Sequence, residues 1–139
     1  LLESSWRKMM DKNFKVGQSN EIVVNDIVYD LHNVYQLGNL SYDGNKLVLE
    51  FYSLENENTG PEKLNLLFEG VDFIQISDEL KINRYWAIEE LGYKETDDYD
   101  DEWLLLESQA SNTAHIFLRL VGGGFIRIHS KTATLALDN

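Results

Sequence analysis

The sequence contains no cysteine, and this absence excludes three kinds of chemistry at once. The chain can form neither a disulfide framework nor a thiolate metal site, and it offers no cysteine nucleophile. A chain without cysteine fits a reducing compartment, so we expect a cytoplasmic protein. Proline occurs only once, at Pro61, where together with Gly60 it indicates an exposed loop.

Positive charge is scarce as well. The chain has 12 Lys and Arg residues against 24 Asp and Glu residues, which gives a formal net charge of -12 and a sequence pI near 4.5. Such a balance argues against attraction to nucleic acid or to an anionic membrane, and it is compatible with a basic protein partner. It is equally typical of a protein that is acidic for solubility alone.

Long apolar runs are also missing. No stretch is long enough to span a bilayer, so we expect no membrane association. The first ten residues, LLESSWRKMM, lack the basic-then-apolar layout of a signal peptide. Leu1 is not a usual first residue, which leaves open both preceding residues and a cleaved signal peptide.

The hydrophobic patterning predicts one mainly β domain over residues 1–139, because the chain has the size of one ordinary domain and 43% of it is hydrophobic. About eight alternating or β-branched runs are separated by turn residues at the close spacing of an antiparallel sheet. We therefore expect an antiparallel β-sandwich or a strongly curved sheet, with α+β as the alternative. A short amphipathic N-terminal helix is predicted from the spacing of Leu2, Trp6, Met9 and Met10.

Individual segments carry more specific expectations. Residues 21–29 are predicted to form one strand with a kink at Asn25 and Asp26, and residues 34–42 and 46–54 to form a hairpin. Further strands are predicted at residues 63–69, 71–77, 103–107 and 131–137. Residues 78–94 have both helical spacing and strand propensity; we favour a short helix that ends at Gly92.

The clearest local pattern lies at residues 113–131, TAHIFLRLVGGGFIRIHSK, where two alternating runs flank three glycines. This pattern predicts a β-hairpin, since a phosphate loop would need a following helix and a Lys-Ser/Thr pair. If Gly122–Gly124 form a three-residue loop, Leu120 lies opposite Ile126 and Leu118 opposite Ile128. The other face then sets Arg119 opposite Arg127 and Phe117 opposite His129.

That second face is a candidate anion-binding site made of Arg119, Arg127 and His129. Two like charges opposite each other repel, so a bound carboxylate or phosphate would stabilise the pair. An internal carboxylate such as Glu50, Glu69 or Glu107 would do the same without any ligand. His129 could act there as a general acid or base, although the sequence supplies no nucleophile beside it.

The acidic stretch at residues 95–103 is a candidate surface for binding a protein partner. It interleaves carboxylates with two aromatic residues, and its members are Asp97, Asp98, Tyr99, Asp100, Asp101, Glu102 and Trp103. Aromatic anchors amid negative charge suit a basic partner. The spacing is not that of a calcium loop, and a solvated loop is the simpler alternative.

Metal and cofactor chemistry find no support in the sequence. The three histidines, His32, His115 and His129, have no metal-ligand spacing, and no GxSxG motif occurs. We therefore expect no metal and no cofactor, and we favour a protein that is not an enzyme, with an enzyme as the alternative.

One resemblance bears on function. The chain contains Asp30-Leu31-His32-Asn33, then GNLSYDGNKLVLEF, LNLLFEGVDFIQIS and IFLRLVGGGFIRIHSKTATL. This order resembles small acidic bacterial proteins of unknown function, some of which are grouped with the immunity proteins of polymorphic toxin systems. The resemblance covers most of residues 30–137, with Asn33 in place of the acid of a histidine-acid pair. It implies a non-enzymatic protein that binds a partner, and it names no catalytic residue.

Three functions follow from these features. The leading hypothesis is an acidic interaction module, in its most specific form an immunity protein that neutralises a basic toxin. The second is a small-anion binder or enzyme that uses Arg119, Arg127 and His129. The third is a structural subunit that self-associates through a free strand edge. The sequence leaves the partner and the oligomeric state open.

Overall fold

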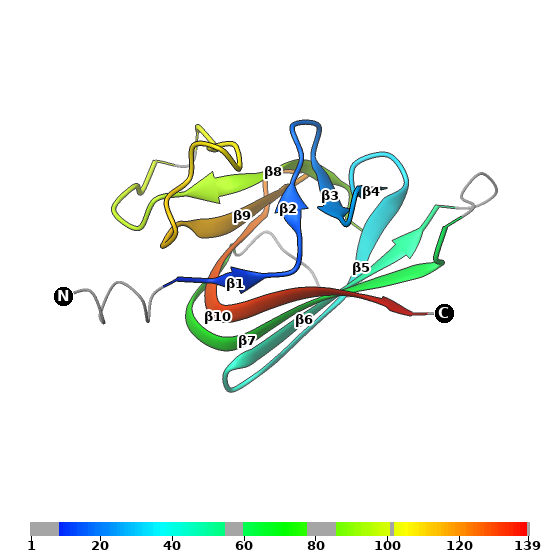
Figure 1. Cartoon of the computed structure of the whole chain (residues 1–139), viewed down its shortest axis with the longest axis horizontal. Helices are drawn as coiled ribbons and strands as arrows, with labels where there is room; N and C mark the ends of the chain where they lie inside the picture. Colours follow the sequence, from blue (N-terminus) through cyan, green and yellow to red (C-terminus); the bar gives the residue numbers. More distant parts are fainter. Residues whose placement is uncertain (1–8, 55–59, 78–85, 101, 139) are drawn as a thin grey trace.

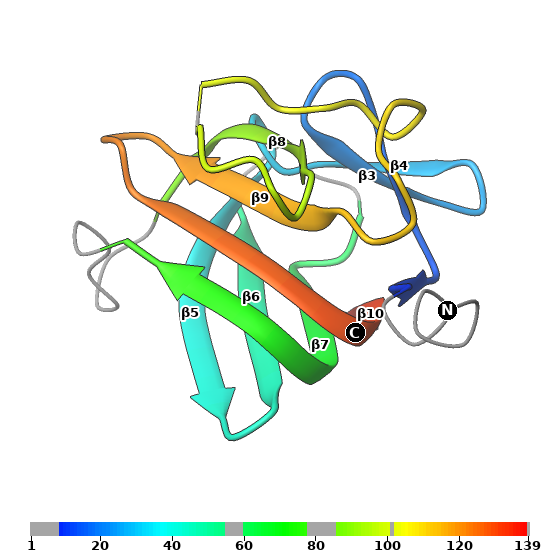
Figure 2. The same cartoon turned by 90° about the vertical axis from the view of Figure 1, so that its left-hand side faces the viewer.

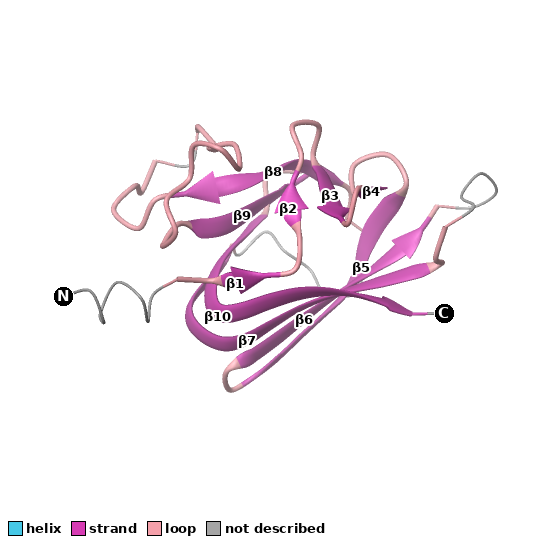
Figure 3. Cartoon of the chain, in the orientation of Figure 1, coloured by secondary structure: helices cyan, strands magenta, loops and turns pink. Residues whose placement is uncertain are grey.

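The computed structural model describes residues 9–54, 60–77, 86–100 and 102–138. This part of the chain contains ten strands and no helix (Figure 3). The strands are β1 (Asp11–Lys12), β2 (Lys15–Val16), β3 (Glu21–Val24), β4 (Ile27–Asp30), β5 (Tyr35–Asp43), β6 (Lys46–Ser53), β7 (Lys63–Ile76), β8 (Ile88–Lys94), β9 (His115–Leu120) and β10 (Phe125–Asp138).

Seven of the strands form one strongly curled sheet in the order β5-β6-β7-β10-β9-β8, and β1 pairs in parallel with β10 (Figure 1). Leu37 of β5 and Trp86, just before β8, exchange two backbone hydrogen bonds of 2.8 Å. These bonds join the two opposite edges of the sheet at one point. The curl is a half-barrel, and the smaller sheet β2-β3-β4 lies over its inner face (Figures 1 and 2).

The core lies inside the curl and follows the period-two alternation of the strands. Leu47, Leu49 and Phe51 of β6 are fully buried, while Val48 and Glu50 between them are half-buried. Leu118 and Ile126 are paired across β9 and β10 and are both fully buried. The small sheet contributes Val16, Ile22 and Tyr29 to the same core. The predicted mainly β, curved antiparallel fold is therefore confirmed.

Four finer expectations differ from the structure. The N-terminal helix is not seen in the described residues, where Met9 and Met10 precede strand β1; residues 1–8 lie outside that part. Asn25 and Asp26 form a two-residue turn between β3 and β4, with φ of 50° and 67°, and not a kink in one strand. Residues 88–94 are strand β8, and residues 78–85 lie outside the described residues. Residues 103–107 contribute only one isolated bridge, at Leu105.

The β9–β10 hairpin is confirmed, but its predicted register is wrong by two residues. Arg119 lies opposite Phe125, and Arg127 lies opposite Phe117. The three-residue loop is Val121–Gly123, in which Gly122 and Gly123 have φ near 100° (102° and 98°), a conformation that glycine adopts readily. Val121 donates its backbone N–H to the carbonyl of Ala87, 2.9 Å away, and this contact holds the loop one residue earlier than expected.

Strands β7 and β10 bend together where β7 leaves β6. Gly70 lies at the bend with φ +69°, and a Cβ there would lie 2.7 Å from the Cβ of Lys131. The register between the two strands shifts at His129 and Ser130, which is a β-bulge. In the described residues, no helix is long and apolar enough to cross a membrane.

Candidate functional site

The outer face of β9 and β10 is buried, although it carries polar side chains. His115, Phe117, Arg127 and His129 are between 1% and 6% exposed. Alternation directs them away from the core, and the segment between β8 and β9 contacts Arg127 from that side through the carbonyls of Glu95 and Asp98. We call these four residues the covered face, and residues 95–103 the acidic loop.

Arg127 joins the covered face to the acidic loop. Its Nη1 donates a 2.6 Å hydrogen bond to the carbonyl of Asp98, and its Nη2 donates one of 2.9 Å to the carbonyl of Glu95. Its guanidinium carbon also lies 5.5 Å from the ring centroid of Phe73 and 5.9 Å from that of Tyr99. Burial lowers the pKa of Arg127, and the nearby charge of Asp98 opposes that shift.

His115 is the neutral partner of Arg127. Nε of Arg127 donates a 2.9 Å hydrogen bond to Nδ1 of His115, which places the imidazole proton on Nε2. Burial, and then the positive charges of Arg127 and His129, lower the pKa of His115 from 6.5 to about 4. His115 is therefore uncharged near neutral pH.

His129 is held by a carboxylate. Its Nδ1 lies 2.6 Å from Oδ1 of Asp72, a residue that the β-bulge displaces from regular pairing. Because a carboxylate only accepts hydrogen bonds, this contact assigns the Nδ1 proton to His129. The other ring nitrogen, Nε2, is buried and has no hydrogen-bond partner in the described chain.

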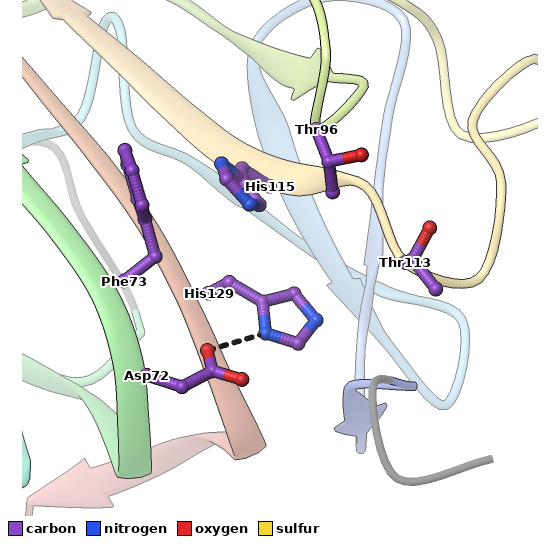
Figure 4. A pocket seen from close by; sticks show the side chains of 6 residues that line it. All are labelled: Asp72, Phe73, Thr96, Thr113, His115 and His129. Carbon is purple, nitrogen blue, oxygen red and sulfur yellow. Dashed lines mark hydrogen bonds and ion pairs between the residues drawn. The ribbon is translucent and has the colours of Figure 1, made fainter. Parts of the chain in front are cut away.

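A pocket of about 180 Å³ opens beside these histidines (Figure 4). It is lined by Asp72, Phe73, Thr96, Thr113, His115 and His129. The ring of Phe73 stacks on that of His115 at 4.4 Å between centroids, and the two imidazole centroids are 5.5 Å apart. The pocket therefore combines an aromatic wall, two imidazoles and two hydroxyl groups.

The acidic loop exposes its aromatic side chains, while its carbonyls at Glu95 and Asp98 are held by Arg127. Tyr99 is 84% exposed and Trp103 is 77% exposed, and Asp97, Asp100 and Glu102 are exposed around them. Oδ2 of Asp98 pairs with the fully buried Nζ of Lys94 at 3.3 Å. The backbone N–H of Asp100, followed by Lys94, holds the pKa of Asp98 below its usual value. Asp101 lies outside the described residues.

The three residues of the predicted anion site share one face but have separate partners. Nε of Arg119 pairs with Glu90 at 2.9 Å, Arg127 bonds backbone carbonyls and His115, and His129 bonds Asp72. Glu50 and Glu107, which were expected to offset the arginines, instead pair with Lys63 and Lys12. Among the residues described, no group of three or more His, Asp or Glu side chains is placed to hold a metal ion.

A second polar network, which sequence reasoning missed, lies at the junction of β1 and β8. The hydroxyl of Tyr93 donates a 2.5 Å hydrogen bond to Oε1 of Glu107, and Lys12 contacts both residues. Burial, and then the contact with Glu107, raise the pKa of Tyr93. Burial acts to raise the pKa of Glu107, but the hydrogen bonds from Tyr93, Val16 and Lys12 outweigh it and lower that pKa. This network joins the N-terminal strand to the sheet.

Asp72 and His115 were not among the predicted site residues. Asp72 reaches His129 only because of the bulge, and His115 reaches Arg127 only because the hairpin register is two residues from the expected one. One signal for this cluster was available: His115 and His129 lie opposite each other if the hairpin loop is centred on Gly122. The predicted loop was centred on Gly123, so this pairing was not recognised. No protein-family model, curated protein or solved structure matches the chain. Function must therefore be argued from the geometry of the site.

Proposed function

We propose that the chain is a non-enzymatic interaction module that binds a basic protein partner through the acidic loop. The observation that carries this proposal is the combination of two anchored backbone carbonyls with exposed aromatic rings. The carbonyls of Glu95 and Asp98 are tied to Arg127, while Tyr99 and Trp103 are 84% and 77% exposed.

Preorganisation favours binding because less conformational entropy is lost when the complex forms. Tyr and Trp side chains are the commonest anchors of protein interfaces, and two such rings exposed on one short loop are unusual for a surface without a partner. Asp97, Asp100 and Glu102 lie beside the rings and would steer a positively charged surface toward them. The net charge of -12 acts in the same direction.

The resemblance to immunity proteins gives the proposal its most specific form. In this form the partner is a basic toxin domain, and the gene for it lies next to the gene for this chain. The product of the adjacent gene is therefore the partner to test first.

The test is a calorimetric titration of that gene product with matched variants. One variant neutralises the loop by Asp97→Asn, Asp100→Asn and Glu102→Gln. The control makes the same change in net charge at three other exposed positions, by Asp11→Asn, Asp26→Asn and Asp43→Asn. We expect the loop variant to bind about tenfold or more weakly, and the control to bind like the native chain. Equal affinity of both variants, or no binding by the native chain, contradicts the proposal in this form.

A second pair of variants tests the exposed aromatic side chains of the acidic loop. Trp103→Ala removes a ring that is 77% exposed, and Tyr42→Ala removes a ring that is 44% exposed on the distant β5–β6 hairpin. We expect Trp103→Ala to weaken binding by about 2 kcal/mol, and Tyr42→Ala to leave it unchanged. Neither change should alter the free energy of unfolding by more than about 0.5 kcal/mol.

A further inference from the structure

We propose that the pocket lined by His129 and His115 binds a compact, neutral, hydroxylated molecule, of the size and chemistry of a polyol or a monosaccharide. The site is separate from the exposed rings of the acidic loop, so this inference does not depend on the proposed protein partner.

The first argument is the unpaired nitrogen of His129. The side chain is 5% exposed, and Nε2 has no partner in the described part of the chain. A buried polar atom left without a hydrogen bond costs about 1–3 kcal/mol. Since Nδ1 of His129 is engaged by Asp72, Nε2 is the ring nitrogen that is left for a ligand. It therefore requires a hydrogen-bond partner in the pocket.

The ring of His115 presents a hydrogen-bond donor. Arg127 donates to its Nδ1, so the proton is on Nε2 and this nitrogen is a donor. The depressed pKa of His115, about 4, keeps that ring neutral. The pocket thus presents the donor of His115 and the unpartnered Nε2 of His129 on rings whose centroids are 5.5 Å apart. A hydroxyl group both donates and accepts, so it can serve both rings.

The charged residues at the pocket favour a neutral hydroxyl group over a charged ligand. The carboxylate of Asp72 at the same pocket would repel a carboxylate or a phosphate. An ammonium group has no acceptor for His115, and the guanidinium of Arg127 lies directly behind that ring. A neutral ligand avoids both conflicts.

The size and the remaining walls suit a molecule with several hydroxyl groups. A pocket of about 180 Å³ has room for roughly six water molecules at ~30 Å³ each, which is the scale of a small polyol or one sugar ring. Thr96 and Thr113 also line the pocket, and the hydroxyl of Thr113, which lies 3.1 Å from that of Ser111, can still take part in a second hydrogen bond. Phe73 supplies an apolar wall for the carbon skeleton.

The experiment is a titration followed by the imidazole ¹⁵N and ¹H signals of the whole chain. The probes are glycerol, myo-inositol, D-ribose and D-glucose, with acetate, phosphate and methylamine as charged comparisons. We expect at least one hydroxylated probe to shift the His129 and His115 signals in a saturable way and to leave His32, outside the pocket, unchanged. We expect His129→Gln to weaken that probe about tenfold, the loss of one hydrogen bond, and His32→Gln to have no effect.

Thr113→Val is a second variant, which keeps both histidines and should also weaken binding several-fold. It remains decisive if His129→Gln does not fold. The proposal is overturned if no hydroxylated probe gives a saturable shift, which would mean that the pocket holds water only. It is also overturned if the charged probes bind more tightly, or if Thr113→Val and a folded His129→Gln both bind like the native chain.

Discussion

Nε of Arg127 donates a 2.9 Å hydrogen bond to Nδ1 of His115, while its two terminal nitrogens donate hydrogen bonds to the carbonyls of Glu95 and Asp98. One guanidinium therefore holds two backbone carbonyls of the acidic loop and, through the same group, sets the tautomer of a pocket histidine. The candidate partner surface and the candidate ligand pocket share this residue.

Replacing Arg127 should destabilise the chain strongly. Arg127→Met removes three hydrogen bonds and leaves two carbonyls and Nδ1 of His115 without their donor, at a cost of about 3 kcal/mol. Arg119→Met is the control, because Glu90, its ion-pair partner, is 48% exposed, and ion pairs that reach solvent contribute about 0–1 kcal/mol. Urea unfolding of both variants measures the difference. Equal losses would show that Arg127 does not hold the loop.

His115 predicts a pH dependence of stability. Its pKa is about 4 in the folded chain against 6.5 as the reference value, so the unfolded chain binds more protons between these two values. The free energy of unfolding therefore falls as the pH falls from 6.5 to 4, by about 3 kcal/mol from this residue. His115→Gln should remove this part of the pH dependence of stability, while the side-chain oxygen of Gln can still accept the hydrogen bond from Arg127.

The measurement for His115 is the difference between the two stability curves. Carboxylates with lowered pKa values, such as Glu107, also lose stability on acidification, but they are present in both proteins and cancel. Parallel curves for the native chain and His115→Gln between pH 4 and 6.5 would contradict the assignment of a neutral, buried His115.

Tyr93→Phe tests the network at the β1–β8 junction. The change removes a buried hydroxyl that donates to Glu107 and contacts Lys12, and we expect a loss of about 1–2 kcal/mol. Tyr42→Phe, at an exposed ring, should cost almost nothing. Thermal unfolding of both variants at neutral pH checks the result, and an equal midpoint for the two would mean that the hydroxyl of Tyr93 contributes no net stability.

Gly70→Ala should destabilise the bend in β7. A side chain at φ +69° is strained by about 1–2 kcal/mol, and the new Cβ would also meet the Cβ of Lys131 at 2.7 Å. Gly44→Ala is the matched control, since its φ is +66° and nothing lies within 4 Å of a Cβ there. The excess loss for Gly70→Ala measures the close contact, and no excess would show that the strands move apart freely.

The alternation of apolar and polar residues was enough to predict the fold class and the strands that have a regular pattern. Period-two patterns identified β5, β6 and the β9–β10 hairpin, and they correctly assigned which residues face the core. Residues 63–69 and 71–77, predicted as two strands, form the single strand β7, and residues 131–137, predicted as a separate strand, belong to β10. Residues 88–94 were misassigned because their strand is decided by pairing with β9, a contact between distant parts of the chain. Local propensity cannot report such pairing.

The candidate site was less predictable than the fold. Arg127 and His129 were identified as polar residues on one face, and the acidic loop was identified by composition. The burial of Arg127 and His129 could not be foreseen, because it depends on the path of the segment that follows β8. The contact between Asp72 and His129 depends on a bulge that leaves no sequence signature.

Hydrogen exchange of the chain, free and bound to the product of its adjacent gene, tests the proposed function most directly. The account predicts that binding slows exchange of the backbone amides of residues 95–103, around Tyr99 and Trp103, and leaves the β5–β6 hairpin unchanged. Protection confined to the β5–β6 hairpin or to the β2-β3-β4 sheet, with the acidic loop unaffected, would contradict it.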